Sequence, residues 1–329
     1  MTDQRFSFHC LPDDLRLKVL QTTGHQEIIA YSFLSKKAFS TVKALRLPIF
    51  NVRITMKKQP EIEVTLSFIS IKFELNMREN DEKMTHLNGF PVDVKVIYEN
   101  SKIREFSEIL SVWSDQGKSV GEWIQHLCSI NQPKYCYIKT FHVREIEFDT
   151  QTLRNVFPKL GNTNIIFNHA EANEHDVQSA KNILKAFLVQ AKCIGLEHVP
   201  LQDHFSLQHI GMGNLESLNM QYPRNMNVHD LSTLNAERIW IDTDQMSLRD
   251  LNWFLKLWMK GSNWKLKELA IFWDTDSLPD WIVLLRGLKA KPKGNSRKKF
   301  IIKNCREIFA EIETDYDEGT ASIEFTVSN

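Results

Sequence analysis

"LESLNM" (215–220), "AERIWI" (236–241) and "LKELAI" (266–271) share one frame, in which apolar residues occupy the first, fourth and sixth positions. The frame recurs as "VREIEF" (143–148), and more weakly as "TNIIFN" (163–168) and "CIGLEH" (193–198). The fourth positions of the six copies are separated by 20, 30, 22, 21 and 30 residues: Ile146, Ile166, Leu196, Leu218, Ile239 and Leu269. This spacing predicts a short strand that is repeated along the second half of the chain.

Helix-like stretches lie between the copies, at 173–191 and 247–260. The repeat length is close to the ~20–29 residues of leucine-rich repeats, in which a strand and a helix stack again and again. We therefore expect a leucine-rich-repeat-like solenoid with a parallel sheet on its inner face. The asparagine that usually follows each strand of such repeats is absent, so an irregular α/β domain is the alternative.

The region before the repeats has a residue pattern typical of β-strands. Four stretches alternate or run β-branched and apolar, starting at Asn51, Ile62, Ile69 and Val92. This pattern predicts an antiparallel strand region. Residues 57–60 look like a turn, 79–91 like an exposed loop, and 119–130 keep the apolar spacing of a helix.

The N-terminal segment "LPDDLRLKVLQTTGHQEIIAYSFLSKK" (11–37) predicts short helices with apolar residues on more than one side. Pro12 suits the first turn of a helix that ends near Thr22, and Gly24 is expected to stop it in a left-handed conformation. Leu11, Leu15 and Val19 make one stripe, and Leu17 and Leu20 lie on roughly the opposite side. Ser35 is a suitable N-cap for a third helix. Either the rest of the chain or another protein must cover the second face.

This segment resembles the F-box, the three-helix module that docks onto the Skp-type adaptor of cullin-based ubiquitin ligases. The motif's usual places are occupied by Leu11-Pro12, Leu15, Val19-Leu20, Ile28 and "LSK" (34–36). Ala38 stands where an aromatic is common, and Thr22-Thr23 replaces the usual apolar pair. The resemblance implies the following adaptor-binding residues: Leu11, Pro12, Leu15, Leu17, Val19, Leu20, Ile28, Leu34, Ser35 and Lys36.

A second resemblance covers the C-terminal part. "SLRDLNWFLKLWMKGSNWKLKEL" (247–269) and "SVGEWIQHLCSI" (119–130) look like the F-box-associated type 2 domain of a large nematode class of F-box proteins. Its residues also fit a buried helix followed by a Gly-Ser-Asn stop. The expected fold is thus α+β or α/β: an F-box-like helical module at 1–48, a strand-rich region plus helix at 49–135, and the repeat-like domain at 136–329.

Composition narrows the class of protein. The chain has 329 residues, of which 42% are hydrophobic and 25% charged, and its net charge is zero. No global field draws it to nucleic acid or anionic lipid, and no apolar run approaches the ~20 residues that span a bilayer. The N-terminus lacks the pattern of a secretory signal, and five scattered cysteines predict free thiols, so the cytoplasm or nucleus is expected. These cysteines are Cys10, Cys128, Cys136, Cys193 and Cys305.

The C-terminal part is divided by charge. Residues 286–306 carry nine Lys or Arg and no acid, whereas 307–329 carry seven acids and no base. We expect a basic loop to face an acidic pair of strands, so that each run neutralises the other. A nucleic-acid patch is the alternative, but the basic run lacks interleaved aromatics.

Catalytic and metal-binding patterns are weak. "DQGKS" (115–119) ends like a phosphate-binding loop, but Val112 occupies the place of its first glycine. "GKSVG" (117–121) matches a nucleophile elbow around Ser119, but polar "SDQ" (114–116) precedes it instead of a buried strand. His126 with Cys128, and Cys136 with His142, lack the spacing of a zinc site. We expect no cofactor, no metal and no enzymatic activity; a hydrolase built on Ser119 or Cys136 is the remaining enzymatic alternative.

The resemblance implies a substrate-recruiting subunit of an SCF-type ubiquitin ligase, which binds the adaptor and through it a cullin, and directs a protein to degradation. The substrate is an unknown protein, and neither nucleic acid nor a membrane is expected as a partner. In a solenoid the residues between the frame positions face the open side, which predicts a substrate patch: Trp240, Phe272, Arg238, Asp242 and Glu268. The alternative for this patch is that neighbouring segments cover both aromatics. The alternative function is a protein-interaction scaffold that is not associated with a ligase.

Overall fold

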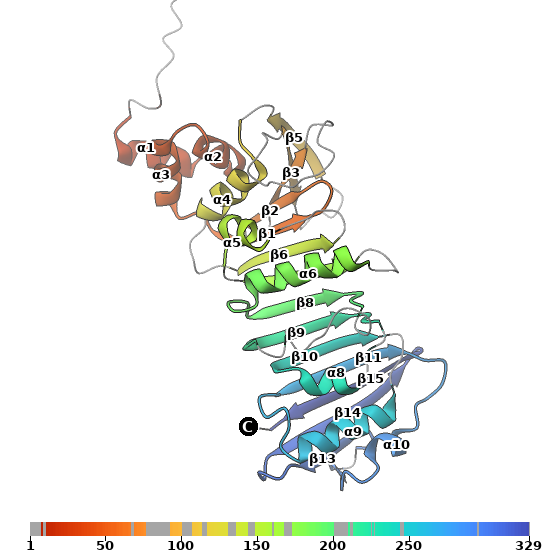
Figure 1. Ribbon diagram of the computed structural model, residues 1–329. Coiled ribbons are helices and arrows are strands. Elements are labelled where there is room, and N and C mark those ends of the chain that lie inside the picture. Colours follow the sequence, from red (N-terminus) through yellow and green to blue (C-terminus); the bar gives the residue numbers. More distant parts are fainter. Residues whose placement is uncertain are drawn as a thin grey trace, which may run out of the picture.

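One sheet runs the length of the molecule, and helices cover one of its faces (Figure 1). The computed structural model describes residues 8, 11–66, 69–76, 93–100, 107–113, 117–130, 136–143, 149–159, 161–167, 173–200, 210, 213–224, 226, 228–243, 247–294 and 296–328. The fifteen described strands follow the order β12-β13-β14-β15-β11-β10-β9-β8-β7-β6-β1-β2-β3-β4-β5. The predicted α+β class is confirmed as helices on a large mixed sheet. The sheet continues across residue 135, and the three-part division of the chain stays a prediction.

The strand-rich region is an antiparallel meander, as its alternating sequence predicts. It consists of β1 (Ile49–Met56), β2 (Glu61–Leu66), β3 (Ile69–Asn76), β4 (Asp93–Asn100) and β5 (Ser107–Trp113). The predicted turn at 57–60 joins β1 to β2, and the expected loop at 79–91 lies outside the described residues. β1 also pairs in parallel with β6 (Cys136–Val143), and this pairing joins the meander to the rest of the sheet.

Parallel strands with intervening helices form the middle of the molecule. The strands are β6, β7 (Asn162–Phe167), β8 (Cys193–Glu197), β9 (Leu215–Gln221), β10 (Ala236–Thr243) and β11 (Glu268–Asp274). The helices are α4 (Val120–Ile130), α5 (Thr150–Val156), α6 (Glu174–Phe187), α8 (Val228–Thr233) and α9 (Leu248–Met259). The predicted helices at 119–130, 173–191 and 247–260 are thereby confirmed.

The repeated frame holds best in the last three copies. Leu218, Ile239 and Leu269 are paired in register on β9, β10 and β11, and all three are buried. In β7 the frame is wrong by one residue, because Ile165 is buried whereas Ile166 is half-exposed on the other face. Two adjacent isoleucines carry no signal that distinguishes the faces of a strand. Ile146 lies outside the described residues, and the leucine-rich-repeat class stays a prediction.

The C-terminal strands close the sheet in antiparallel fashion. They are β12 (Lys291–Pro292), β13 (Lys299–Lys303), β14 (Phe309–Asp317) and β15 (Thr320–Val327), and the short helix α10 (Trp281–Leu285) precedes them. β15, the last of these in sequence, lies beside β11, so the hairpin of β14 and β15 folds back onto the end of the parallel part.

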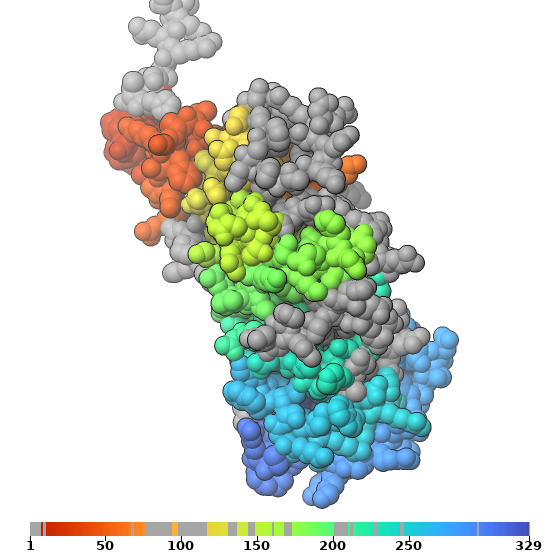
Figure 2. Space-filling model, viewed as in Figure 1, coloured from red at the N-terminus to blue at the C-terminus, as the bar shows by residue number. Residues whose placement is uncertain are grey.

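The main core lies between the sheet and the helices. The rings of Phe141, Phe157 and Phe187 pack together under α6, and Trp258 of α9 meets Phe325 of β15 edge to face. Figure 2 shows α5, α6 and α9 spread over this face of the molecule. Asn173 and Asp176 form a capping box at the start of α6, which satisfies amides that would otherwise lack partners.

Three helices form the N-terminal unit: α1 (Asp13–Gln21), α2 (His25–Ser32) and α3 (Lys36–Leu45). Ser35 caps α3 as predicted, because its Oγ accepts a hydrogen bond from the amide of Ala38 at 3.1 Å. The expectation for Gly24 is wrong: its backbone is extended, not left-handed, and it precedes α2 as the N-cap. α1 already ends at Gln21, and the threonines that follow it bond back to the carbonyl of Val19.

The N-terminal unit is attached to the sheet through α4. The ring of Phe33 stacks on that of His126, with centroids 3.8 Å apart, and also packs against Trp123. Phe39 of α3 contacts the same imidazole, and Ser32 Oγ hydrogen-bonds to His126 Nε2 at 2.7 Å. Burial, and secondarily the charge of Lys118, lower the pKa of His126 from 6.5 to about 4. The imidazole at this contact is therefore neutral at physiological pH.

Acid should loosen this attachment. Between pH 6.5 and about 4 the unfolded chain binds a proton at His126 that the folded chain does not bind, so stability falls as the pH is lowered through this window. We expect the midpoint of urea unfolding to drop between pH 7 and pH 5. In the His126→Gln variant, whose amide can still bond to Ser32, this drop should be smaller. An equal drop in both proteins would contradict the assignment.

Candidate functional site

Among the described residues, the helices lie on one face of the sheet, and the other face presents strand side chains (Figure 1). We call it the open face; it carries the side chains that alternate with the core residues of each strand. Strand register aligns these side chains in rows across the sheet. The Glu197 row contains Ile166, Glu197, Gln221, Asp242, Phe272 and Ser322. The Gly195 row contains Asn164, Gly195, Asn219, Trp240, Ala270 and Glu324. The Arg238 row contains Cys193, Ser217, Arg238, Glu268 and Thr326.

A hollow of about 120 Å³ lies on the open face over β7, β8 and β9. Its polar lining comes from the side chains of Asn164, Glu197, Asn219 and Gln221. Gly195 lies in the lining of the hollow and permits the close approach of Asn164, because a β-carbon at this position would stand 2.4 Å from Asn164 Oδ1. This hollow was not predicted, although an isolated glycine inside a strand pattern is a signal for close approach of another group.

The five residues of the predicted substrate patch lie together on the open face. Arg238 is paired with Glu268 and Asp242 with Phe272 on adjacent strands, and Trp240 stands between the two pairs. All five side chains are partly exposed. Their role in binding a substrate stays a prediction.

Asp242 is the most perturbed carboxylate of this patch. Desolvation raises the pKa of Asp242 above its ordinary value, and no ion pair reaches it from the residues that the structure describes. Glu197, in the same row, has its neighbour His198 at 3.8 Å, and this imidazole is charged only when protonated. Among the described residues, Asp242 and Glu197 at the centre of the open face thus have no lysine or arginine in ion-pair contact.

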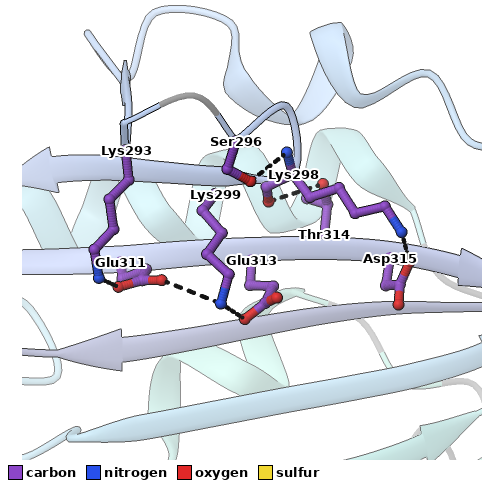
Figure 3. Close-up of polar contacts among 8 residues, drawn as sticks. All are labelled: Lys293, Ser296, Lys298, Lys299, Glu311, Glu313, Thr314 and Asp315. Carbon is purple, nitrogen blue, oxygen red and sulfur yellow. Dashed lines mark hydrogen bonds and ion pairs between the residues drawn. The ribbon is translucent and has the colours of Figure 1, made fainter.

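Towards the C-terminus the same face is neutralised internally, as the charge division of the sequence predicts. Lys293 pairs with Glu311, Lys298 with Asp315, and Lys299 with Glu313 at 2.7 Å. Figure 3 shows these side chains on the near side of the strands, with helices behind them. The predicted basic run facing an acidic strand pair is confirmed, so these acids are already satisfied and do not extend the unpaired charge of Asp242 and Glu197.

The N-terminal unit has a second exposed surface, which is apolar. Leu15, Val19 and Leu34 are 42%, 44% and 68% exposed, respectively. Of the other predicted adaptor residues, Leu11 and Leu17 are half-exposed, and Pro12, Ser35 and Lys36 are exposed.

Two of the predicted adaptor residues need correction. Leu20 and Ile28 are each only 3% exposed, because they belong to the core between the helices, and their side chains are not available to a partner. The face that the chain leaves bare is the Leu15 and Val19 stripe, not the side of α1 that bears Leu20. Arg16, 1% exposed, takes the inward place on α1 that an aliphatic residue would be expected to fill.

The weak catalytic motifs have structural explanations. Ser119 caps α4, with its amide and hydroxyl donating to Glu122 Oε2 at 2.8 and 3.1 Å, so its oxygen serves the helix end. Desolvation raises the pKa of Cys128 to about 12, which disfavours a thiolate there. The described part of the chain contains no cluster of three His, Cys, Asp or Glu that could hold a metal ion. The side chain of Cys136 lies outside the described atoms.

Comparison with known proteins supports the resemblance seen in the sequence. Residues 206–271 match the family described as F-box associated. The chain is 23% identical, over 274 residues, to the F-box associated domain-containing protein sdz-33 of Caenorhabditis elegans, covering 81% of this chain and 78% of that protein. No solved structure matches. The predicted resemblance to nematode proteins with an F-box-associated domain is thereby confirmed. In the described residues, no helix is both long and apolar enough to cross a membrane.

Truncation of Trp240 should leave the protein folded. The ring lies on the open face, so Trp240→Ala should lower the free energy of unfolding by about 1–2 kcal/mol, less than the ~3–5 kcal/mol expected for a fully buried tryptophan. Trp258→Ala, at a position only 2% exposed, is the matched control. Urea titrations of both variants provide the measurement. Equal losses would mean that Trp240 is a core residue and would exclude it from a recognition patch.

Replacement of Ser119 should affect stability through the helix cap alone. Ser119→Ala removes the cap of α4 and should cost about 1 kcal/mol of unfolding free energy. Ser129→Ala, on the exposed side of the same helix, should cost less. Esterase activity of the intact chain that disappears in Ser119→Ala would contradict the structural role.

Proposed function

We propose that this protein is the substrate-recruiting subunit of an SCF-type, cullin-based ubiquitin ligase. The N-terminal unit would bind a Skp-type adaptor, and through it a cullin, while the C-terminal domain binds a protein substrate. The F-box-like motif of residues 11–36 supports the first part. The match of residues 206–271 to the F-box associated family supports the second. Such a role would place the protein in the cytoplasm or nucleus.

The observation that carries the proposal is the bare apolar stripe of α1. Leu15 and Val19 are one turn apart and both nearly half exposed, and Leu34 at the end of α2 is more exposed still. Leaving such side chains in water gains nothing for folding, whereas covering them with a partner would remove apolar area from solvent. The other side of the unit is already occupied, because Leu20, Ile28 and Val42 are buried in the core.

The attachment of the unit to α4 supports a role in positioning. The stacked contact of Phe33 with His126 and the hydrogen bond between Ser32 and His126 hold the unit against α4. The sheet then continues without interruption from β1 to the open face of β7–β11. A partner on the N-terminal unit and a substrate on the open face would thus be held at a set separation. In this scheme the chain performs no chemistry and contributes only a high effective concentration.

Co-expression with a Skp-type adaptor tests the proposal. The intact chain should co-purify in a stoichiometric complex, and the double variant Leu15→Asp/Val19→Asp should lose the complex while its unfolding midpoint stays unchanged, because both side chains are exposed. Val189→Asp places a charge on a residue that is 90% exposed at the end of α6 and is the matched control. Loss of binding on replacement of Leu11 and Pro12 would extend the contact to the start of α1.

Failure of the intact, folded chain to bind the adaptor would overturn the ligase assignment. The scaffold without ligase association would then be the better description. Equal losses of binding in Val189→Asp and in the double variant would show that the contact does not depend on the α1 stripe.

A further inference from the structure

The unpaired charge at the centre of the open face is predominantly negative. On β8–β11 and β15 the open-face rows contain Glu197, Asp242, Glu268 and Glu324 against one cation, Arg238. Within the described part of the chain none of these four carboxylates has a lysine or arginine in ion-pair contact, whereas Glu311, Glu313 and Asp315 of β14 are each paired with a lysine. The protein therefore neutralises the outer strands of this face and leaves the centre charged.

The hollow beside Glu197 suits the end of a basic side chain. Its volume of about 120 Å³ is far larger than the ~10–15 Å³ that a single water needs. Glu197 supplies a carboxylate, and the amides of Asn164, Asn219 and Gln221 supply carbonyl oxygens that can accept further hydrogen bonds. A lysine ammonium or arginine guanidinium, which only donates, matches this lining better than an acid does.

A second site for a cation lies two strands away in the same row. Asp242 is separated from Glu197 by Gln221 of β9, so the two carboxylates are roughly 10 Å apart at a strand spacing of ~4.8 Å. The partly exposed side chains of Trp240 and Phe272 flank Asp242, on its own strand and on the next. An aromatic face next to a carboxylate binds lysine or arginine through both the ring and the charge.

From these features we propose that the open face over β7–β11 binds an extended, lysine- or arginine-rich segment of a protein. One basic side chain would enter the hollow at Glu197, and a second would lie against Trp240 beside Asp242. An extended chain advances ~3.3 Å per residue, so about three residues cover the distance between the two carboxylates. The proposal of a basic segment rests on the proposed function in one respect: the open face is the surface that would bind the recruited protein.

Peptide binding to the full-length protein tests this occupant without the adaptor. The probe is a fluorescein-labelled octapeptide of alternating lysine and serine, with glutamate-serine and glycine-serine octapeptides of equal length for comparison. Fluorescence anisotropy should detect binding of the lysine peptide alone, weakening as salt is raised from 50 to 500 mM because screening reduces the attraction.

Substitutions locate the binding. Glu197→Gln and Asp242→Asn should each weaken the lysine peptide about three- to fivefold, the range of a partly exposed ion pair. Gly195→Leu, which fills the hollow, should weaken it about tenfold or more. Glu174→Gln removes one charge from the first turn of α6, on the helix-covered side, and should leave affinity unchanged. If Gly195→Leu does not fold, the two isosteric variants carry the test.

Equal binding of the three peptides would overturn the proposal, as would lysine-peptide affinity that is indifferent to Glu197→Gln and Asp242→Asn. These outcomes are distinct from failure of the ligase assignment. If the protein binds the adaptor but not the lysine peptide, only the proposal of a basic segment on the open face is refuted. If the protein binds the lysine peptide but not the adaptor, the proposal of a basic segment on the open face stands and the ligase role is refuted.

Discussion

The burial of one face of a single sheet is the constraint on which the rest of the structure depends. The strands of the parallel part place most of their apolar side chains towards the helices, and register keeps those side chains aligned from strand to strand. Because side chains alternate along a strand, fixing the buried set also fixes the exposed set. The rows of the open face are thus a consequence of core packing and not an independent design. The side chains of a surface obtained in this way can change without disturbing the fold.

The same constraint explains why the N-terminal unit has two unlike sides. Its inner side contributes Leu20, Ile28 and Val42 to the common core and Phe33 to the contact with α4. Its outer side is not needed by this chain, and it keeps Leu15, Val19 and Leu34 in solvent. Helices this short would be marginal in isolation, so their stability must come largely from packing. The contact with His126 therefore both stabilises the N-terminal unit and fixes the orientation of its exposed apolar stripe.

Much of the architecture could be predicted from the sequence, because strong periodicity makes a local pattern sufficient. The first four strands of the meander, the helices α4, α6 and α9, and the frame around Leu218 and Ile239 follow from apolar spacing, whereas β5 was not predicted. The predictions were wrong at positions where tertiary contacts determine which side chain is buried or where a helix begins. Ile165 and Ile166 are equally apolar, and only packing chooses which is buried; Gly24 could end one helix or begin the next. The predicted patch at Trp240 was found from the frame. The hollow was missed because it exists only when Asn164, Gly195 and Asn219 come from three neighbouring strands, which no local pattern reveals.

The strand at the C-terminal margin of the sheet has a consequence for solubility. β12 contains only Lys291 and Pro292, and Lys293 follows it. Proline offers no amide hydrogen to a further strand, and lysines on either side repel a similarly charged one. So long an uninterrupted sheet would otherwise end in a row of unsatisfied backbone groups open to another molecule. A two-residue, positively charged margin disfavours edge-to-edge stacking of copies and so keeps the broad face of the sheet accessible.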